Sequence, residues 1–201
     1  MKLQEAYHPA DESSPVLETT VGSALREAAR RWPDGVAMVE GIPGPAAGRR
    51  RWTNSQLLAD AEAVAGALLA RFEPGERVAA WAHNIPEWIL LEYGAGLARV
   101  VLVTVNPAYR PSELAYVLGQ SGASGIVLVP EFRSPMAAFL EEVRPELPAL
   151  REAILFPSDA AAPPKMTPWK EFLALAPNGG PLPGVAPTDP AQIQYTSGTT
   201  G

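Results

Sequence analysis

The sequence predicts an α/β fold in which a layered, mostly parallel sheet is flanked by helices. Short apolar runs alternate with amphipathic segments at least three times between residues 77 and 156. Strands that alternate with helices in this way form parallel sheets with right-handed crossovers. The run at residues 100–105 is almost purely β-branched, as strands buried on both faces are. The chain has 201 residues, of which 47% are hydrophobic, so it can bury a substantial core.

The N-terminal part of this fold is expected to contain two helices and two short extended segments. The first helix opens at Thr20 and ends before Pro33, which cannot continue it. The extended segments are residues 36–40 and 51–53, on either side of a Gly/Pro-rich loop. Thr53 and Gln56 have the spacing of a capping box and predict the start of the second helix. Its apolar face consists of Leu57, Ala61, Val64, Ala65, Leu68, Leu69 and Phe72.

The remainder of the chain is expected to alternate strand and helix. Pro86 fits the first turn of a helix, where its missing N–H costs nothing, and Gly122 fits the end of another. Thr167 and Pro168 have the character of an N-cap and a first helical residue. The expected strands are residues 78–82, 100–105, 126–129, 153–156 and 191–195, the expected helices are 86–98, 111–120, 134–144 and 168–175, and 177–190 is expected to be a linker.

The composition excludes several kinds of chemistry. The chain has no cysteine, so it forms no disulfide, thiolate nucleophile or cysteine zinc site. Its two histidines, His8 and His83, are 75 residues apart, which argues against a histidine metal cluster. The net charge of −6 argues weakly against nucleic-acid binding, which needs clustered Lys and Arg. The one basic run, residues 49–51, is expected to be a solvated hairpin or loop.

The sequence shows neither a secretory leader nor a membrane span. The first fifteen residues lack an apolar core, and no apolar stretch reaches the roughly 18 residues of a span. We therefore expect a cytoplasmic protein with no transmembrane segment.

The end of the sequence is its most informative part. Residues 191–195 alternate as a strand does, and six small residues follow: Thr196, Ser197, Gly198, Thr199, Thr200 and Gly201. Such a loop can turn successive backbone N–H groups inward to bind an anion, and its hydroxyls add donors to phosphate oxygens. The loop lacks the Gly-Lys-Ser/Thr ending of a Walker A loop and the G-x-G-x-x-G dinucleotide pattern. By composition alone, an ordinary flexible turn is an equal alternative.

Three segments resemble one family in the same order and spacing. Residues 195–201, Tyr-Thr-Ser-Gly-Thr-Thr-Gly, resemble the first half of the phosphate-loop signature of the adenylate-forming (AMP-binding) enzymes. Residues 105–114, Val-Asn-Pro-Ala-Tyr-Arg-Pro-Ser-Glu-Leu, resemble a block of the acyl-CoA synthetase branch, which Tyr116, Leu118, Ser121 and Gly122 continue. Residues 84–88 match the Asn-x-x-Glu-Trp helix start. The resemblance spans about residues 20–201 and leans toward fatty-acyl-CoA synthetases of medium- or long-chain type.

This resemblance implies an activity in two halves. A carboxylic acid, expected to be a fatty acid, attacks the α-phosphorus of ATP in the presence of Mg²⁺, which gives an acyl-adenylate and releases pyrophosphate. The thiol of CoA then displaces AMP from the acyl-adenylate and forms the thioester. The implied cofactor-binding residues, which would hold the β- and γ-phosphates, are Thr196, Ser197, Gly198, Thr199, Thr200 and Gly201. The resemblance implies no catalytic residue and no metal ligand within this chain.

The resemblance also implies where the domain boundary lies in this chain. Residues 1–18 are expected to be a loose lead-in, and residues 19–201 a partial AMP-binding N-terminal domain that is cut within the phosphate loop. The loop lysine and the later motifs of the family are not in the sequence. We therefore expect the N-terminal subdomain of a longer synthetase, truncated and inactive by itself. Its partner would be the missing C-terminal portion of its own enzyme.

Two other interpretations stay open. The chain could come from an amino-acid or aryl-acid adenylation enzyme of the same superfamily, or it could be a non-catalytic binding module that retains this subdomain. Residues outside the loop are expected to be structural. These are His83 in a loop or cap, Asn106 and Arg110 in turn formation or ion pairing, and Trp32, Trp52, Trp81, Trp88 and Trp169 in core packing.

Overall fold

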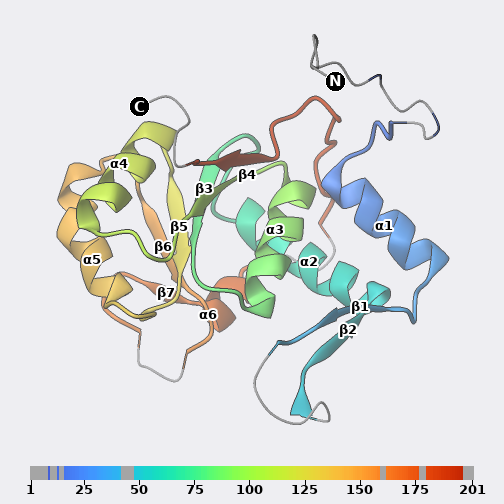
Figure 1. The fold of residues 1–201 in the computed structure, drawn as a ribbon, viewed down its shortest axis with the longest axis horizontal. Coiled ribbons are helices and arrows are strands. Elements are labelled where there is room, and N and C mark those ends of the chain that lie inside the picture. Colours follow the sequence, from blue (N-terminus) through green and yellow to red (C-terminus); the bar gives the residue numbers. More distant parts are fainter. Residues whose placement is uncertain are drawn as a thin grey trace, which may run out of the picture.

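Six parallel strands form the centre of the structure, a computed structural model that describes residues 9, 13, 16–41, 48–158, 162–176 and 180–196. Their order across the sheet is β7-β6-β5-β3-β4-β8 (Figure 1). The strands are β3 (Arg77–Trp81), β4 (Val101–Val105), β5 (Gly125–Leu128), β6 (Glu152–Leu155), β7 (Thr167–Pro168) and β8 (Gln192–Gln194). Every pair of neighbours is parallel, so the expected parallel sheet is confirmed.

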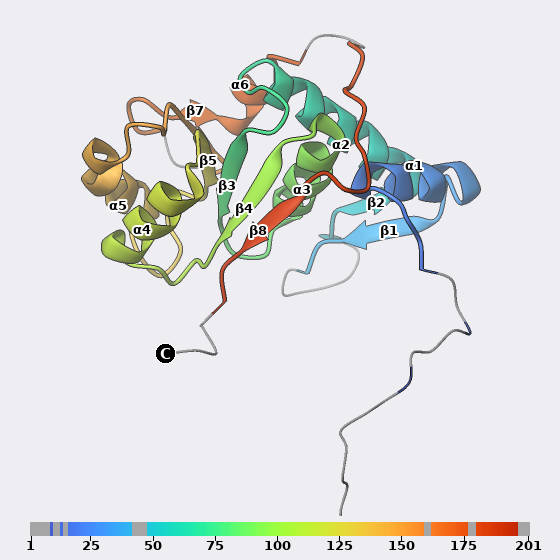
Figure 2. The same ribbon diagram turned by 90° about the horizontal axis from the view of Figure 1, so that it is seen from above.

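Helices cover both faces of this sheet. They are α1 (Val21–Arg31), α2 (Asn54–Leu69), α3 (Pro86–Ala98), α4 (Pro111–Ser121), α5 (Met136–Val143) and α6 (Trp169–Leu173), with a 3-10 turn at Arg144–Glu146. Figure 2 shows α2 and α3 on one face of the sheet and α4 and α5 on the other. The α1 helix packs outside α2 and α3. Strands β3, β4 and β5 are consequently buried on both faces.

The start and end signals in the sequence are confirmed at three helices. The Thr53 hydroxyl accepts the N–H of Gln56 at 3.3 Å, and the Gln56 side chain accepts the N–H of Thr53 at 2.9 Å. Pro86 is the first residue of α3. Gly122 follows α4 with φ 63°, a left-handed conformation that glycine adopts without strain. These signals act within one turn of chain, which is why the sequence alone reveals them.

The α2 and α3 helices pack closely against each other. Gly94 of α3 faces Val64 of α2, and a Cβ atom on Gly94 would lie 2.5 Å from Val64 Cγ1. Glycine is therefore required at this crossing by space rather than by its backbone conformation. A separate antiparallel hairpin, β1 (Val36–Val39) and β2 (Arg51–Thr53), packs beside α2.

Two expectations from the sequence are wrong. Thr167 is not an N-cap and Pro168 is not the first residue of a helix, because Pro168 itself occupies the N-cap position of α6. They pair with Ile154 and Leu155 as strand β7, and α6 begins one residue later, at Trp169, and ends at Leu173. The pairing is with a strand 13 residues back, so local helix signals could not reveal it. Trp32 is not in the core, since 61% of it is exposed.

The linker expectation is confirmed where the structure describes it, because residues 180–190 form neither helix nor strand. Residues 177–179 of that segment lie outside the described residues. Within the described ranges, no helix is both long enough and apolar enough to cross a membrane.

Candidate functional site

The carboxyl ends of the parallel strands share one edge of the sheet, and this edge holds the residues that the sequence singles out. The segment after β3 begins with Ala82 and His83, the segment after β4 with Asn106, and the segment after β8 with Tyr195. β4 and β8 are hydrogen-bonded neighbours with Val103 opposite Ile193 (Figure 2). In open α/β sheets, ligands bind outside the carboxyl ends of the strands.

The turn after β4 is built on Asn106. Its side-chain oxygen accepts the N–H of Ala108 at 2.9 Å, and its carbonyl accepts the N–H of Tyr109 at 3.0 Å. The same carbonyl accepts the indole N–H of Trp81, the last residue of β3, at 3.0 Å. The turn-forming role expected of Asn106 is thus confirmed, and the turn is joined to the neighbouring strand.

Arg110 connects this turn to α4. Its backbone N–H donates to the Glu113 carboxylate at 2.9 Å, and Pro111 is the first helical residue. The guanidinium lies over the ring of Phe139 on α5, 6.0 Å from the ring centroid. Arg110 therefore has the structural role expected of it, through a cation–π contact rather than the ion pair that the sequence suggested.

Tyr195 connects the strand before the Ser/Thr/Gly loop to the same helix. Its hydroxyl donates to the Val117 carbonyl of α4 at 3.3 Å, and burial raises the pKa of this hydroxyl. The strand that precedes the loop and the helix that follows the Asn106 turn are therefore in direct contact, although 78 residues separate Tyr195 from Val117.

The loop itself begins at the carboxyl end of β8. Thr196 is described and exposed. The other implied cofactor-binding residues, Ser197, Gly198, Thr199, Thr200 and Gly201, lie outside the described residues. The donor set of this loop, backbone N–H groups and hydroxyls without a carboxylate, suits phosphate oxygens rather than a metal ion. Among the residues that the structure describes, no group of three or more His, Asp or Glu side chains gathers that could hold a metal ion.

The Asn-x-x-Glu-Trp segment contains an ion pair that the sequence did not reveal. Glu87, in the first turn of α3, is buried, and its carboxylate accepts from Arg50 Nη1 at 2.6 Å. Arg50 also donates to Glu40 at 2.7 Å and lies over Trp52. Hydrogen bonds to the two carboxylates raise the pKa of Arg50. The basic run at residues 49–51 is therefore only partly solvated, because Arg50 fastens the β1–β2 hairpin to α3.

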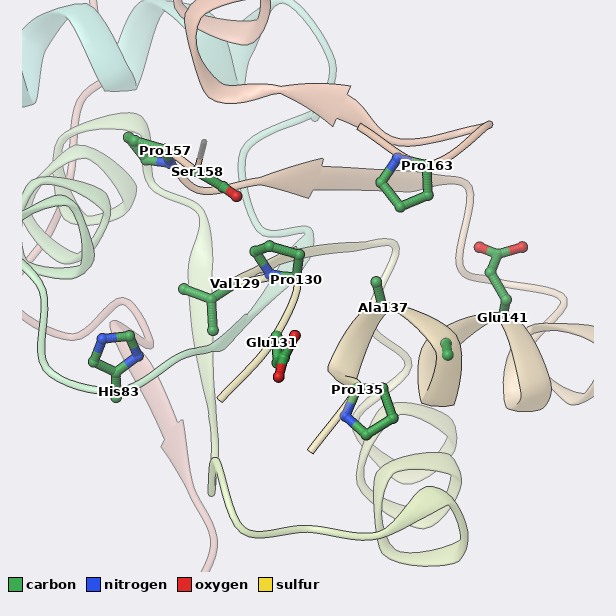
Figure 3. A pocket seen from close by; sticks show the side chains of 11 residues that line it. His83, Val129, Pro130, Glu131, Pro135, Ala137, Glu141, Pro157, Ser158 and Pro163 are labelled. Atoms are coloured by element: carbon green, nitrogen blue, oxygen red, sulfur yellow. The ribbon is translucent and has the colours of Figure 1, made fainter. Parts of the chain in front are cut away.

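A cavity of about 590 Å³ opens at another part of the carboxyl edge, beyond β3, β5 and β6. Figure 3 shows His83 and Glu141 on opposite sides of it, with Glu131 between them. The His83 ring stacks on Phe132, with 4.5 Å between centroids, and its Nδ1 is buried without a hydrogen-bond partner. Thr196 follows β8, at the margin of the sheet beyond β4, and is not among the residues that line this cavity.

The chain matches the family described as "AMP-binding enzyme" over residues 25–201. It is 32% identical to the mouse protein "Medium-chain acyl-CoA ligase ACSF2, mitochondrial", over 98% of this chain and 34% of the relative. It is also 32% identical to "Triostin synthetase I" of Streptomyces triostinicus, over 92% of this chain and 32% of that protein.

Among solved structures, it is similar to a Mycobacterium tuberculosis fatty acyl CoA synthetase, with a TM-score of 0.67 and 25% identity, over 89% of this chain and 32% of that chain. The chain spans about a third of the length of the curated relatives it matches. Its strands, its helices and the family match agree with the resemblance found in the sequence, and the chain belongs to the AMP-binding enzyme family.

Proposed function

We propose that the natural protein is an ATP-dependent, AMP-forming acyl-CoA synthetase that acts on a fatty acid of medium or long chain. One observation carries the proposal. Parallel pairing of β4 with β8 brings the start of the Ser/Thr/Gly loop at Thr196 to the edge where the Asn106 turn lies. The two segments that resemble acyl-CoA synthetases most specifically are thereby joined through the hydrogen bond from Tyr195 to Val117.

The loop is proposed to hold phosphates. ATP supplies an activated phosphoanhydride, and little covalent chemistry is then left to the protein. The hydroxyls of Ser197, Thr199 and Thr200 and the backbone N–H groups of Gly198 and Gly201 would donate to the β- and γ-phosphates. Because the loop has no carboxylate, the group through which proteins usually bind Mg²⁺, we assign Mg²⁺ no ligand in this chain. We likewise propose no catalytic residue and no CoA-binding residue within it.

The proposal extends to the domain bounds of the chain and to its activity when it is isolated. Residues 1–18 are proposed to be a lead-in and residues 19–201 part of an AMP-binding domain, in keeping with the family match that starts at residue 25. The 201-residue chain alone is proposed to be inactive, because the family's loop lysine and later motifs are not in it. The cytoplasmic location stays a prediction.

The identity of the acid rests on the relatives. Similarity to medium-chain acyl-CoA ligases over 98% of the chain supports a fatty acid. Similarity to Triostin synthetase I over 92% of the chain keeps an amino-acid or aryl-acid adenylation enzyme as a second candidate.

A substrate panel tests the proposal. The natural protein, at the length its gene encodes, is assayed for acid-dependent exchange of pyrophosphate into ATP, with fatty acids from octanoate to stearate, aryl acids and amino acids. Exchange driven by fatty acids alone is expected. Exchange driven only by an amino acid or an aryl acid would establish the second candidate, and no exchange with any acid would favour a binding module. Exchange by the 201-residue chain would refute its inactivity.

A further inference from the structure

Arg99 occupies a backbone conformation that usually belongs to glycine. It is the residue that follows α3, with φ 58° and ψ 31°. A side chain in this left-handed region is strained, and helices that end this way usually place glycine there. The backbone hydrogen bonds at this position, from Arg99 N–H to the Ala95 carbonyl and from Gly75 N–H to the Arg99 carbonyl, would be available to glycine as well. Replacing Arg99 with glycine would therefore remove the side chain and keep these backbone hydrogen bonds.

The Arg99 side chain forms a two-point ion pair with Asp189. Its Nε lies 3.0 Å from Asp189 Oδ2, and its Nη2 lies 3.4 Å from Oδ1. Only 19% of the Asp189 side chain is exposed, so the pair is partly shielded from water. Asp189 also closes its own turn, because Oδ2 accepts the N–H of Ala186 at 2.9 Å and its N–H donates to the Ala186 carbonyl at 3.0 Å.

The turn closed by Asp189 leads directly into β8. The other side-chain hydrogen bonds to this strand and to the residue after it lie farther along the chain, from the Thr104 hydroxyl to the Ile193 carbonyl at 3.4 Å and from the Tyr195 hydroxyl to the Val117 carbonyl at 3.3 Å. β8 has three residues and lies at the margin of the sheet. Gln192 and Gln194 are exposed, so Ile193 is its one inward apolar side chain. A slip by one residue would turn Ile193 outward. Its first contact with β4 is the hydrogen bond from Leu102 N–H to the Ala191 carbonyl at 3.0 Å, two residues after Asp189.

We propose that Arg99 and Asp189 are a positioning pair for the phosphate loop. By fixing the register of β8 against β4 from the amino end, they determine where Thr196, the first residue of the loop, leaves the carboxyl end of β8. Arg99 and Asp189 precede the amino ends of β4 and β8, whereas Thr196 follows the carboxyl end of β8. This inference rests on the proposed function only for the claim that the loop binds ATP.

The first test measures the register directly. Amide hydrogen exchange is followed at Leu102, which donates to Ala191, and at Val101, which donates to Glu76 on the other side of β4. In Arg99→Gly and Asp189→Asn, exchange at Leu102 is expected to rise about two- to tenfold, the range for loss of one partly exposed ion pair, while Val101 stays unchanged. Arg99→Gly is suited to this test because glycine relieves the strained conformation and preserves the helix end.

The second test measures the effect on the site in the natural protein. The KM for ATP is expected to rise about two- to tenfold in both variants, while the KM for the carboxylic acid stays within twofold of the wild type. Arg99→Lys, which keeps the charge but not the two-point contact, should be intermediate. Lys165→Gly is the matched control, because Lys165 also has a positive φ of 66° and makes no ion pair among the described residues.

The outcomes separate the two proposals. Unchanged Leu102 exchange in Arg99→Gly, or equal rises in the KM for ATP and for the acid, would overturn the positioning role. A wild-type protein that consumes no ATP with any acid would refute the proposed function, and the loop-positioning claim with it. The exchange rates would then decide the register claim by themselves.

Discussion

The indole of Trp81 donates a hydrogen bond to the backbone carbonyl of Asn106 at 3.0 Å, and this bond joins the carboxyl ends of β3 and β4. Trp81 is fully buried, so the donor has no water to replace its partner. The bond holds the Asn106 turn against the centre of the sheet. This turn leads into α4, the helix that Tyr195 contacts.

Removing the indole donor should destabilise the fold. Trp81→Phe loses the hydrogen bond to Asn106 and part of a buried side chain, so the free energy of unfolding in urea should fall by about 1–3 kcal/mol. Trp32→Phe is the control, because Trp32 is 61% exposed, and its effect should stay within about 0.5 kcal/mol. Equal effects of the two substitutions would show that the bond to Asn106 contributes nothing.

Removing the cation beside Glu87 should also destabilise the fold. Arg50→Met leaves the Glu87 carboxylate buried without its guanidinium. The expected loss is about 1–3 kcal/mol, below that of a fully buried pair because 49% of the Arg50 side chain is exposed. Urea unfolding measures it, with Arg51→Met at the next residue of the chain as control. In a double-mutant cycle, adding Glu87→Gln should restore part of the loss, and strict additivity would contradict the pairing.

Adding a methyl group where α3 crosses α2 should destabilise the fold. In Gly94→Ala, the new Cβ would lie 2.5 Å from Val64 Cγ1, and the overpacking should cost about 1–3 kcal/mol. Gly119→Ala in α4 is the matched control, because its Cβ would meet only Leu147 at 3.8 Å. That variant should gain about 0.5–1 kcal/mol through helix propensity. Thermal unfolding of both variants measures the two effects. A Gly94→Ala variant more stable than Gly119→Ala would contradict the tight packing of α2 against α3.

Acid should weaken the contact between Glu76 and Arg151. A two-point hydrogen bond from the Arg151 guanidinium lowers the pKa of Glu76 from 4.5 to about 2. Because the folded state binds this proton less tightly than the unfolded state, the pair stabilises the fold above pH 4.5. That stabilisation is lost as the pH falls toward 2.

The difference in unfolding free energy between the wild type and Glu76→Gln should therefore shrink over that range. At neutral pH it should be no more than about 1 kcal/mol, because the pair is partly exposed. Glu142→Gln, on the exposed side of α5, should keep the wild-type pH profile. A difference for Glu76→Gln that is constant from pH 7 to 2 would contradict the assignment.

The sequence predicted what depends on neighbouring residues and missed what depends on distant ones. The Thr53–Gln56 capping box, Pro86 at a helix start and the left-handed Gly122 are local, and all three are present. The parallel sheet followed from the alternation of apolar runs with amphipathic segments between residues 77 and 156.

Two ion pairs join partners that no short sequence pattern connects. Arg50 and Glu87 are 37 residues apart, and Arg99 and Asp189 are 90 apart. In the sequence, a basic run and an arginine at the end of a helix look like ordinary surface features. Only the fold brings Glu87 and Asp189 close to these arginines. The positions of residues 197–201 stay a prediction from the resemblance, since only Thr196 of the loop is described.

The acyl-CoA synthetase proposal is decided by the products that the natural protein makes from ATP, Mg²⁺, CoA and a fatty acid, identified by mass spectrometry. We expect equal amounts of AMP and fatty acyl-CoA. In the Thr199→Ala variant we expect a KM for ATP raised about tenfold, the cost of one strong phosphate hydrogen bond, with the KM for the fatty acid unchanged. Formation of ADP in place of AMP, or of no thioester with any fatty acid, would contradict the proposal.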